Sequence, residues 1–172
     1  MKAIVVYESL WGNTAAIARV IAEGIGHGAQ VLSTAEASGA VIAEIGLIVV
    51  GAPVLGFNLP DENMRASVRS NSFGAPVPPN LDHPSVRSWL AGLPKGHARS
   101  AAFETGLWWS PGGATTAINR GLEAGGYLPL VKGQRFIVTG KYGPLRKGEL
   151  ERARLWGAEL FQMMFQPVQK GG

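Results

Sequence analysis

The sequence predicts an α/β protein: a three-layer fold in which an open parallel sheet carries helices on both faces. Short apolar runs alternate along the chain with longer segments whose apolar residues recur at helical spacing. The runs at 3–7 and 46–51 are continuously apolar and rich in β-branched residues, which is typical of strands buried on both faces. Strands that alternate with helices in this way favour a parallel sheet between two helical layers.

Each regular element is expected from its own pattern. We expect strands at about 3–7, 29–33, 46–51, 98–104 and 134–139, and helices at about 13–25, 84–92, 112–124 and 147–165. In the last of these helices Leu150, Ala153, Trp156, Leu160 and Met164 fall near one face. The strand at 29–33 has the weakest pattern of the five.

The stretch 57–82 is too long for an ordinary connection between regular elements. Proline occupies positions 60, 76, 78 and 79 within it, so we expect a segment that is ordered without being regular. Long loops in compact domains are often functional, and this one is large enough to shape a substrate pocket.

Composition bounds the class of protein. The 172 residues fit one domain, 1–172, and 46% of them are hydrophobic, enough for a sizeable core. The chain has no cysteine, which excludes disulfides, thiolate metal sites and cysteine nucleophiles and is compatible with the cytoplasm. Its apolar stretches are shorter than the about 20 residues needed to cross a bilayer. We therefore expect a cytoplasmic protein without a transmembrane segment.

The net charge of +4 does not by itself predict a nucleic-acid partner. A nucleic-acid binder concentrates its basic residues and interleaves them with aromatic ones. Here the largest basic cluster, between positions 146 and 154, is mixed with Glu149 and Glu151. That pattern is typical of a solvated helix face with opposite charges, so we expect no nucleic acid as a partner.

The turn that joins the first strand to the first helix has the chemistry of an anion site. A helix N-terminus offers unpaired backbone N–H groups and the positive end of its dipole. Ser9, Asn13 and Thr14 add hydroxyl and amide donors, and Gly12 lets the backbone bend close to a ligand. No glycine-rich nucleotide motif ending in Lys-Ser or Lys-Thr is present, so a single terminal phosphate fits better than a triphosphate. The alternative is that these residues only cap the helix.

The full spacing of this region resembles the flavodoxin signature. The matching positions in the run 4–21 are Val5, Val6, Tyr7, Ser9, Gly12, Thr14, Ala18 and Ile21. The segments "GLIVVGAPV", "AAFETGLWWSPGGAT" and "FIVTGKYGPLRKGELERARLWGAEL" also resemble later parts of flavodoxin-like proteins, so the resemblance covers nearly the whole chain. It implies non-covalent FMN on a five-stranded parallel sheet of order 2-1-3-4-5.

The resemblance also implies which loops hold the cofactor. The phosphate would lie on the loop after the first strand, and the flavin ring between the loops after the third and fourth strands. The residues expected to bind FMN are Ser9, Leu10, Trp11, Gly12, Asn13, Thr14, Pro53, Val54, Leu55, Gly56, Phe57, Glu104, Thr105, Gly106, Trp108, Trp109, Gly112 and Gly113.

Four aromatic residues in these loops have alternative roles. Phe57 either stacks on the flavin or anchors the long loop to the core. Trp108 and Trp109 are neighbours, so we do not expect both to be buried, and one of them is expected to cover the flavin. Trp11 is either an exposed side chain of the phosphate loop or a lid over the ribityl chain.

Two departures from typical electron carriers, the charge of the chain and the length of the stretch 57–82, leave the reaction open. Those carriers are usually strongly acidic, whereas this chain is basic and its long loop holds Arg65 and Arg69. Either arginine would raise the flavin potential if it lay near the ring, and the alternative is that both are surface residues.

We therefore expect an FMN-binding protein of electron transfer, with a redox partner protein or a small-molecule electron acceptor. The alternative is an FMN-dependent oxidoreductase that acts on quinones or a porphyrin-like substrate. A non-redox protein that has lost FMN is disfavoured by the intact phosphate loop. No side chain is assigned a catalytic role and no metal site is expected, because His27, His83 and His97 lack metal-ligand spacing. The oligomeric state stays open.

Overall fold

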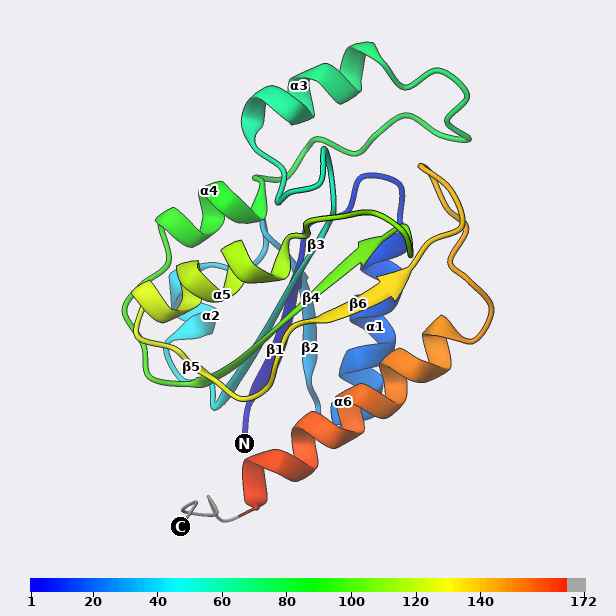
Figure 1. Cartoon of the computed structure of the whole chain (residues 1–172). Helices are drawn as coiled ribbons and strands as arrows, with labels where there is room; N and C mark the ends of the chain where they lie inside the picture. Colours follow the sequence, from blue (N-terminus) through cyan, green and yellow to red (C-terminus); the bar gives the residue numbers. More distant parts are fainter. Residues whose placement is uncertain (167–172) are drawn as a thin grey trace.

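A computed structural model describes residues 1–166 of the chain (Figure 1). Its strands are β1 (Ala3–Tyr7), β2 (Gln30–Ser33), β3 (Leu47–Pro53), β4 (Arg99–Gly106), β5 (Leu128–Pro129) and β6 (Gln134–Ile137). All of their pairings are parallel. The sheet order is β2-β1-β3-β4-β5, which confirms the predicted topology.

The outer strand beside β4 is built from two pieces. β5 pairs with Arg99 and Ser100 at the start of β4, and β6 pairs with Phe103 to Gly106 at its end. Since β3 occupies the other side of β4 along its length, both pieces lie on the same edge. The strand predicted at 134–139 is β6, which ends at Ile137. The two-residue β5 carries no recognisable strand pattern and was not expected.

Helices cover both faces of the sheet. They are α1 (Asn13–Ile25), α2 (Gly39–Ile42), α3 (Glu62–Ser70), α4 (Val86–Ala91), α5 (Thr115–Ala124) and α6 (Glu149–Phe165). In Figure 1, α1 and α6 lie on one face of the sheet, while α2, α4 and α5 lie on the other. Alternation within β1 supplies both cores, because Val5 faces α1 and α6 whereas Ile4 and Val6 face the opposite layer.

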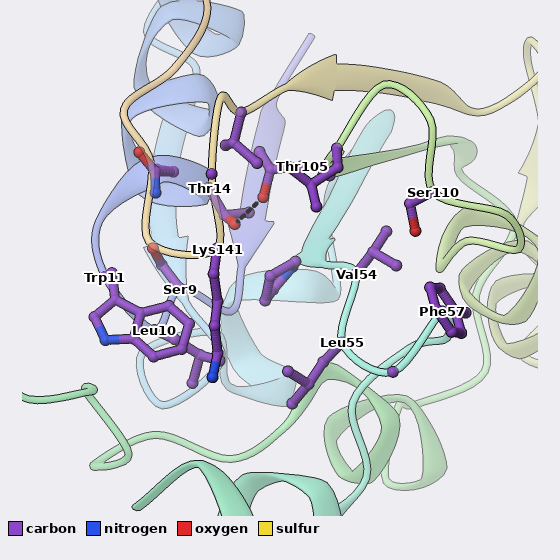
Figure 2. Close-up of a pocket in the computed structure, with 17 residues that line it drawn as sticks. Ser9, Leu10, Trp11, Thr14, Val54, Leu55, Phe57, Thr105, Ser110 and Lys141 are labelled. Carbon is purple, nitrogen blue, oxygen red and sulfur yellow. Dashed lines mark hydrogen bonds between the residues drawn. The ribbon is translucent and has the colours of Figure 1, made fainter. Parts of the chain in front are cut away.

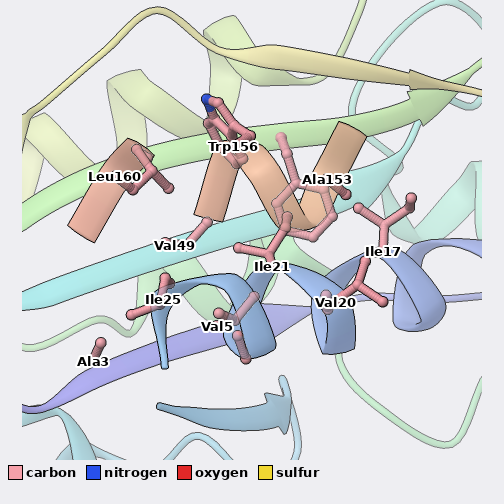
Figure 3. Packing of buried hydrophobic residues seen from close by; sticks show 14 of the residues in the cluster. Ala3, Val5, Ile17, Val20, Ile21, Ile25, Val49, Ala153, Trp156 and Leu160 are labelled. Carbon is pink, nitrogen blue, oxygen red and sulfur yellow. The ribbon is translucent and has the colours of Figure 1, made fainter. Parts of the chain in front are cut away.

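The α1–α6 layer is packed closely (Figure 3). Ile17 and Ile21 of α1 share one buried cluster with Trp156 and Leu160 of α6, and all but Trp156 are fully buried. Gly157 allows this approach, since a Cβ there would lie 2.2 Å from the carbonyl oxygen of Ile21. The two helices are therefore fixed against each other by backbone contact as well as by side chains.

The stretch 57–82 differs from the expectation of irregular structure, because it contains α3. Asp61 caps this helix by accepting a hydrogen bond from the Met64 N–H (2.8 Å), and Glu62 lies in its first turn. All four prolines lie outside it. Figure 1 shows α3 beyond the carboxyl ends of the strands, so it borders the end of the sheet where ligands bind in such folds.

The remaining differences concern short elements and boundaries. The one-turn helix α2 was not expected. The helices predicted at 84–92, 112–124 and 147–165 begin slightly later than expected, at Val86, Thr115 and Glu149. Among residues 1–166, none of the helices has both the length and the apolar character that crossing a bilayer requires.

Candidate functional site

A pocket of about 220 Å³ opens at the carboxyl ends of the strands (Figure 2). The loops after β1, β3, β4 and β6 all contribute to its wall. Its lining residues are Ser9, Leu10, Trp11, Asn13, Thr14, Pro53, Val54, Leu55, Gly56, Phe57, Thr105, Gly106, Leu107, Ser110, Val138, Gly140 and Lys141. The three loops selected from the sequence thus meet at one site, joined by a fourth that was not selected.

The loop after β1 presents the N-terminus of α1 to this pocket. Gly12 adopts the left-handed conformation (φ 96°) at the start of the helix, where no side chain caps the backbone. The first N–H to enter the helical ladder is that of Ala16, which bonds to the Gly12 carbonyl. The N–H groups of Asn13 and Thr14 therefore have no acceptor within the helix, as an anion site requires.

Polar side chains hold this loop in position. The Ser9 hydroxyl accepts from the Gly12 N–H (3.1 Å), and Asn13 donates to the carbonyl of Tyr142 (3.1 Å). The hydroxyls of Thr14 and Thr105 share a buried hydrogen bond of 2.8 Å. Because a hydroxyl carries one donor and two acceptor sites, the Thr14–Thr105 pair keeps one O–H free for a ligand.

The loop after β3 forms a tight turn on another side of the pocket. Leu55 and Asn58 exchange backbone hydrogen bonds of 2.9 and 3.1 Å, and Gly56 and Phe57 between them both have positive φ. Phe57 lines the pocket with 55% of its surface exposed. A ring this exposed does not anchor the loop to a core, and stacking on the flavin stays a prediction.

The loop after β4 is held by Arg135, which the sequence analysis did not single out. Its guanidinium donates to the carbonyl oxygens of Leu107 (3.0 Å), Ser110 (2.8 Å) and Gly112 (2.8 Å). It also forms an ion pair of 2.6 Å with Glu104. One side chain on β6 therefore fixes the path of a loop more than twenty residues earlier in the sequence.

Several residues expected at the cofactor do not line the pocket. They are Gly12, Glu104, Trp108, Trp109, Gly112 and Gly113. Glu104 points instead to the N-terminus of α5, where its carboxylate accepts from the N–H groups of Ala114 (2.5 Å) and Thr115 (2.9 Å). Trp108 and Trp109 are 75% and 58% exposed, so neither is buried, and neither lines the pocket.

The loop after β6 supplies the charged side chain of the wall, Lys141. Its amino group donates to the carbonyl oxygen of Asn71 (3.3 Å) and lies 5.2 Å from the centre of the Tyr142 ring. The same ring meets half-buried Trp11 edge-on at 4.7 Å, so Trp11 is packed against the loop after β6. The sequence signal for this loop was a strand followed by Thr-Gly-Lys, at the fifth carboxyl end of the predicted sheet.

A buried polar cluster lies beside the loop after β1 and corrects the expectation that Arg65 is a surface residue or lies near the ring. Arg65 is only 4% exposed and pairs with fully buried Glu8 at 3.0 Å, so it is neither a surface residue nor part of the pocket wall. Glu8 also accepts from the Val86 N–H (2.9 Å), and His83 Nε2 accepts from the Ser9 N–H (3.2 Å). Arg69 is exposed and does not line the pocket either.

Burial dominates the electrostatics of this cluster. It raises the pKa of the Glu8 carboxyl, against the lowering effects of the Val86 N–H and of Arg65. Burial also lowers the pKa of His83, and the positive charge of Arg65 lowers it further. The neutral imidazole is therefore favoured, which leaves Nε2 free to accept the hydrogen bond from Ser9.

Comparison with solved structures identifies the fold. An archaeal flavodoxin superposes with a TM-score of 0.66 at 21% identity, covering 96% of this chain and 100% of that chain. Flavodoxin 1 from Bacillus cereus gives 0.65 at 18% identity, covering 94% and 98%. The flavodiiron core Flv1 from Synechocystis gives 0.62 at 17% identity, with 95% of this chain and 36% of that chain covered. The chain has the flavodoxin-like fold. No protein-family model and no curated protein matches it.

The pocket of this flavodoxin-like fold suits a flavin mononucleotide. One end offers the free N–H groups of α1 to a phosphate, and the rest of the wall is largely apolar, as a flat ring requires. Among residues 1–166, no carboxylate lines it, so these residues do not repel a dianion. Within residues 1–166, no group of three or more His, Asp or Glu side chains gathers as a metal site would.

Proposed function

We propose that the chain binds FMN without a covalent bond and uses it for electron transfer. The observation that carries this proposal is one pocket that joins the uncapped N-terminus of α1 to an apolar slot between the loops after β3 and β4. The likeness to flavodoxins supports it at the level of fold. When bound, FMN would supply one- and two-electron redox chemistry, while the protein supplies position and electrostatics.

The residues of the chain divide this work between them. The N–H groups at the start of α1, with Ser9, Asn13 and Thr14, would hold the phosphate. Leu55 and Phe57 would contact the ring on one side, and the loop held by Arg135 would meet it on another. The positive charge of Lys141 would favour anionic states within the pocket. A cytoplasmic location belongs to the same proposal, since the chain needs no disulfide.

A dedicated oxidoreductase is the second candidate. The observation that favours it is α3, which adds a polar and partly apolar wall beside the pocket instead of an irregular loop. A carrier and an oxidoreductase differ in turnover, because only the second reduces a small acceptor catalytically with an external electron donor. A carrier is expected to pass single electrons to protein partners and to show no such turnover.

The first test is the visible spectrum of the purified protein, with mass analysis of any released cofactor. We expect a yellow protein that releases FMN, or a colourless one that becomes yellow when FMN is added. A protein that stays colourless in excess FMN contradicts the proposal.

Replacement of Thr14 by alanine tests where the phosphate lies. Loss of one charge-assisted hydrogen bond of about 1.5–3 kcal/mol raises the Kd for FMN by about 10- to 150-fold. Thr116→Ala, at an exposed position of α5 outside the pocket, is the control. Fluorescence quenching of FMN measures both values. Equal affinities in the two variants show that the phosphate lies elsewhere.

A further inference from the structure

A second hollow adjoins the pocket on the side of α3. Asn63, Met64, Ser67 and Asn71 form its far wall, on α3 and at the end of that helix. Leu55, Gly56 and Lys141 line this groove and the cofactor pocket alike. Only these shared residues therefore separate a molecule in the groove from a ligand in the pocket, and no helix or strand of the described chain lies between them.

The groove combines an apolar base with polar edges. Leu55, Met64 and Val68 supply aliphatic and thioether surface, which suits a flat apolar body. Asn63, Ser67 and Asn71 are exposed and carry amide and hydroxyl groups. Small-molecule sites usually combine an apolar surface with a small number of polar groups.

Lys141 gives the groove an uncompensated positive charge. Among the described residues its amino group makes no ion pair; it donates to the carbonyl of Asn71 and lies near the Tyr142 ring. The buried glutamates at the ends of β1 and β4 are each neutralised by an arginine, Glu8 by Arg65 and Glu104 by Arg135. The remaining charge at this junction therefore attracts anions.

The wall of the groove is anchored before any ligand arrives. Arg65 ties α3 to Glu8 at the end of β1, and Asp61 caps the helix. On the other side the Tyr142 hydroxyl donates to the carbonyl of Phe73 (3.0 Å). A preformed site loses less entropy on binding than one that must be assembled.

We propose that this groove binds a small anionic molecule with a flat apolar body, its negative group at Lys141 and its body against Leu55 and Met64. Only the role of the bound molecule rests on the proposed function. Beside bound FMN, this molecule is the small-molecule electron acceptor. The binding itself depends on the groove alone.

The test is a calorimetric titration of the FMN-loaded protein, in which FMN already occupies the neighbouring pocket. The probes are 2-naphthalenesulfonate and the neutral 2-naphthalenemethanol, which share one ring system and differ in charge. We expect the sulfonate to bind at least tenfold more tightly than the alcohol. Lys141→Gln removes this preference, whereas Lys147→Gln, an exposed cation of the same loop outside the groove, keeps it.

A pair of neighbouring substitutions locates the site. Ser67→Trp fills the groove and abolishes binding of the sulfonate, whereas Ala66→Trp, exposed on the same helix but outside the groove, leaves binding unchanged. Asn63→Trp repeats the blockade if Ser67→Trp fails to fold. Equal affinities for the two probes, or unchanged binding in the blocked variants, overturn the proposal.

Failure of this proposal is distinguishable from failure of the proposed function. A protein that does not bind FMN contradicts the function, and the Ser67→Trp and Ala66→Trp comparison then proceeds on the unloaded protein. A protein that binds FMN equally in both variants but shows no difference in sulfonate binding contradicts the groove alone.

Discussion

Arg135 holds one loop of the pocket wall, although the sequence analysis did not single it out. Its planar fork reaches three carbonyl oxygens of the loop after β4 and the carboxylate of Glu104 at once. Lysine cannot reproduce this, because its charge sits on a single nitrogen. In sequence Arg135 is one polar residue at the start of a strand, and nothing in its neighbours indicates the loop that it holds.

Two substitutions of Arg135 separate the effect of its charge on stability from the effect of its hydrogen bonds on the loop after β4. Arg135→Met leaves buried Glu104 without its ion-pair partner and lowers the free energy of unfolding by about 3–5 kcal/mol. Arg135→Lys keeps the charge but releases the loop, so the Kd for FMN rises while stability falls less. Urea unfolding and FMN titration measure the two effects, with exposed Arg120→Lys as the control. Wild-type FMN affinity in Arg135→Lys contradicts a positioning role.

His83 makes the stability of the protein depend on pH. Its pKa in the folded state lies below the ordinary value of 6.5, so its contribution is fully present above pH 6.5. That contribution is lost as the pH falls through the folded pKa, by at most about 1.4 kcal/mol per pH unit. His83→Gln keeps an acceptor for the Ser9 N–H without titrating. Urea unfolding between pH 8 and 5 is expected to show that the free energy of unfolding falls more steeply in the wild type than in His83→Gln. Parallel curves for the two proteins contradict this role of His83.

At the scale of elements, the proline content of the stretch 57–82 led to an expectation of irregular structure and missed α3. The segment 61–70 contains an N-cap aspartate, an acidic first turn and no proline, which together are signals for a helix. The four prolines that suggested irregular structure only bound it: Pro60 precedes it, and the others follow from position 76. The helix is amphipathic in an unusual way, since Arg65 shares its buried side with Val68.

The Glu8–Arg65 pair is expected to anchor α3 to the sheet. Arg65→Met leaves an uncompensated buried carboxylate and lowers the free energy of unfolding by about 3–5 kcal/mol. Because burial already raises the pKa of Glu8, this loss becomes smaller as the pH falls and Glu8 takes up a proton. The double variant Glu8→Gln/Arg65→Met recovers part of the stability at pH 7. Equal instability of the single and double variants contradicts the assignment.

At the scale of the whole molecule, the pocket joins four loops from distant parts of the chain. A ligand that contacts all of them stabilises the folded state as a unit, by about 2.7 kcal/mol at a concentration 100 times its Kd. We expect FMN to raise the unfolding temperature in proportion to the logarithm of its concentration. Riboflavin, which lacks the phosphate, gives a smaller shift in the same calorimetric measurement. Equal shifts contradict a phosphate site at α1.

Taken over the whole chain, the sequence by itself predicted the layers, and its resemblance to flavodoxins implied the sheet order. The layers follow from local signals, which are continuous apolar runs for strands and helical spacing for helices. A local signal fixes an element and the loop at its end, because both are formed by residues that are neighbours in the chain.

Only the tertiary structure decided which polar residues share the site. Arg65 lies inside beside Glu8, Glu104 turns from the pocket to α5, and Lys141 enters the wall from the loop after β6. In each case the deciding partner is far away in sequence. The direction of a polar side chain depends on the burial and charge of groups that only the folded sheet brings together. The sequence therefore predicts which loop offers an anion site, and the tertiary structure decides which charged groups surround the pocket.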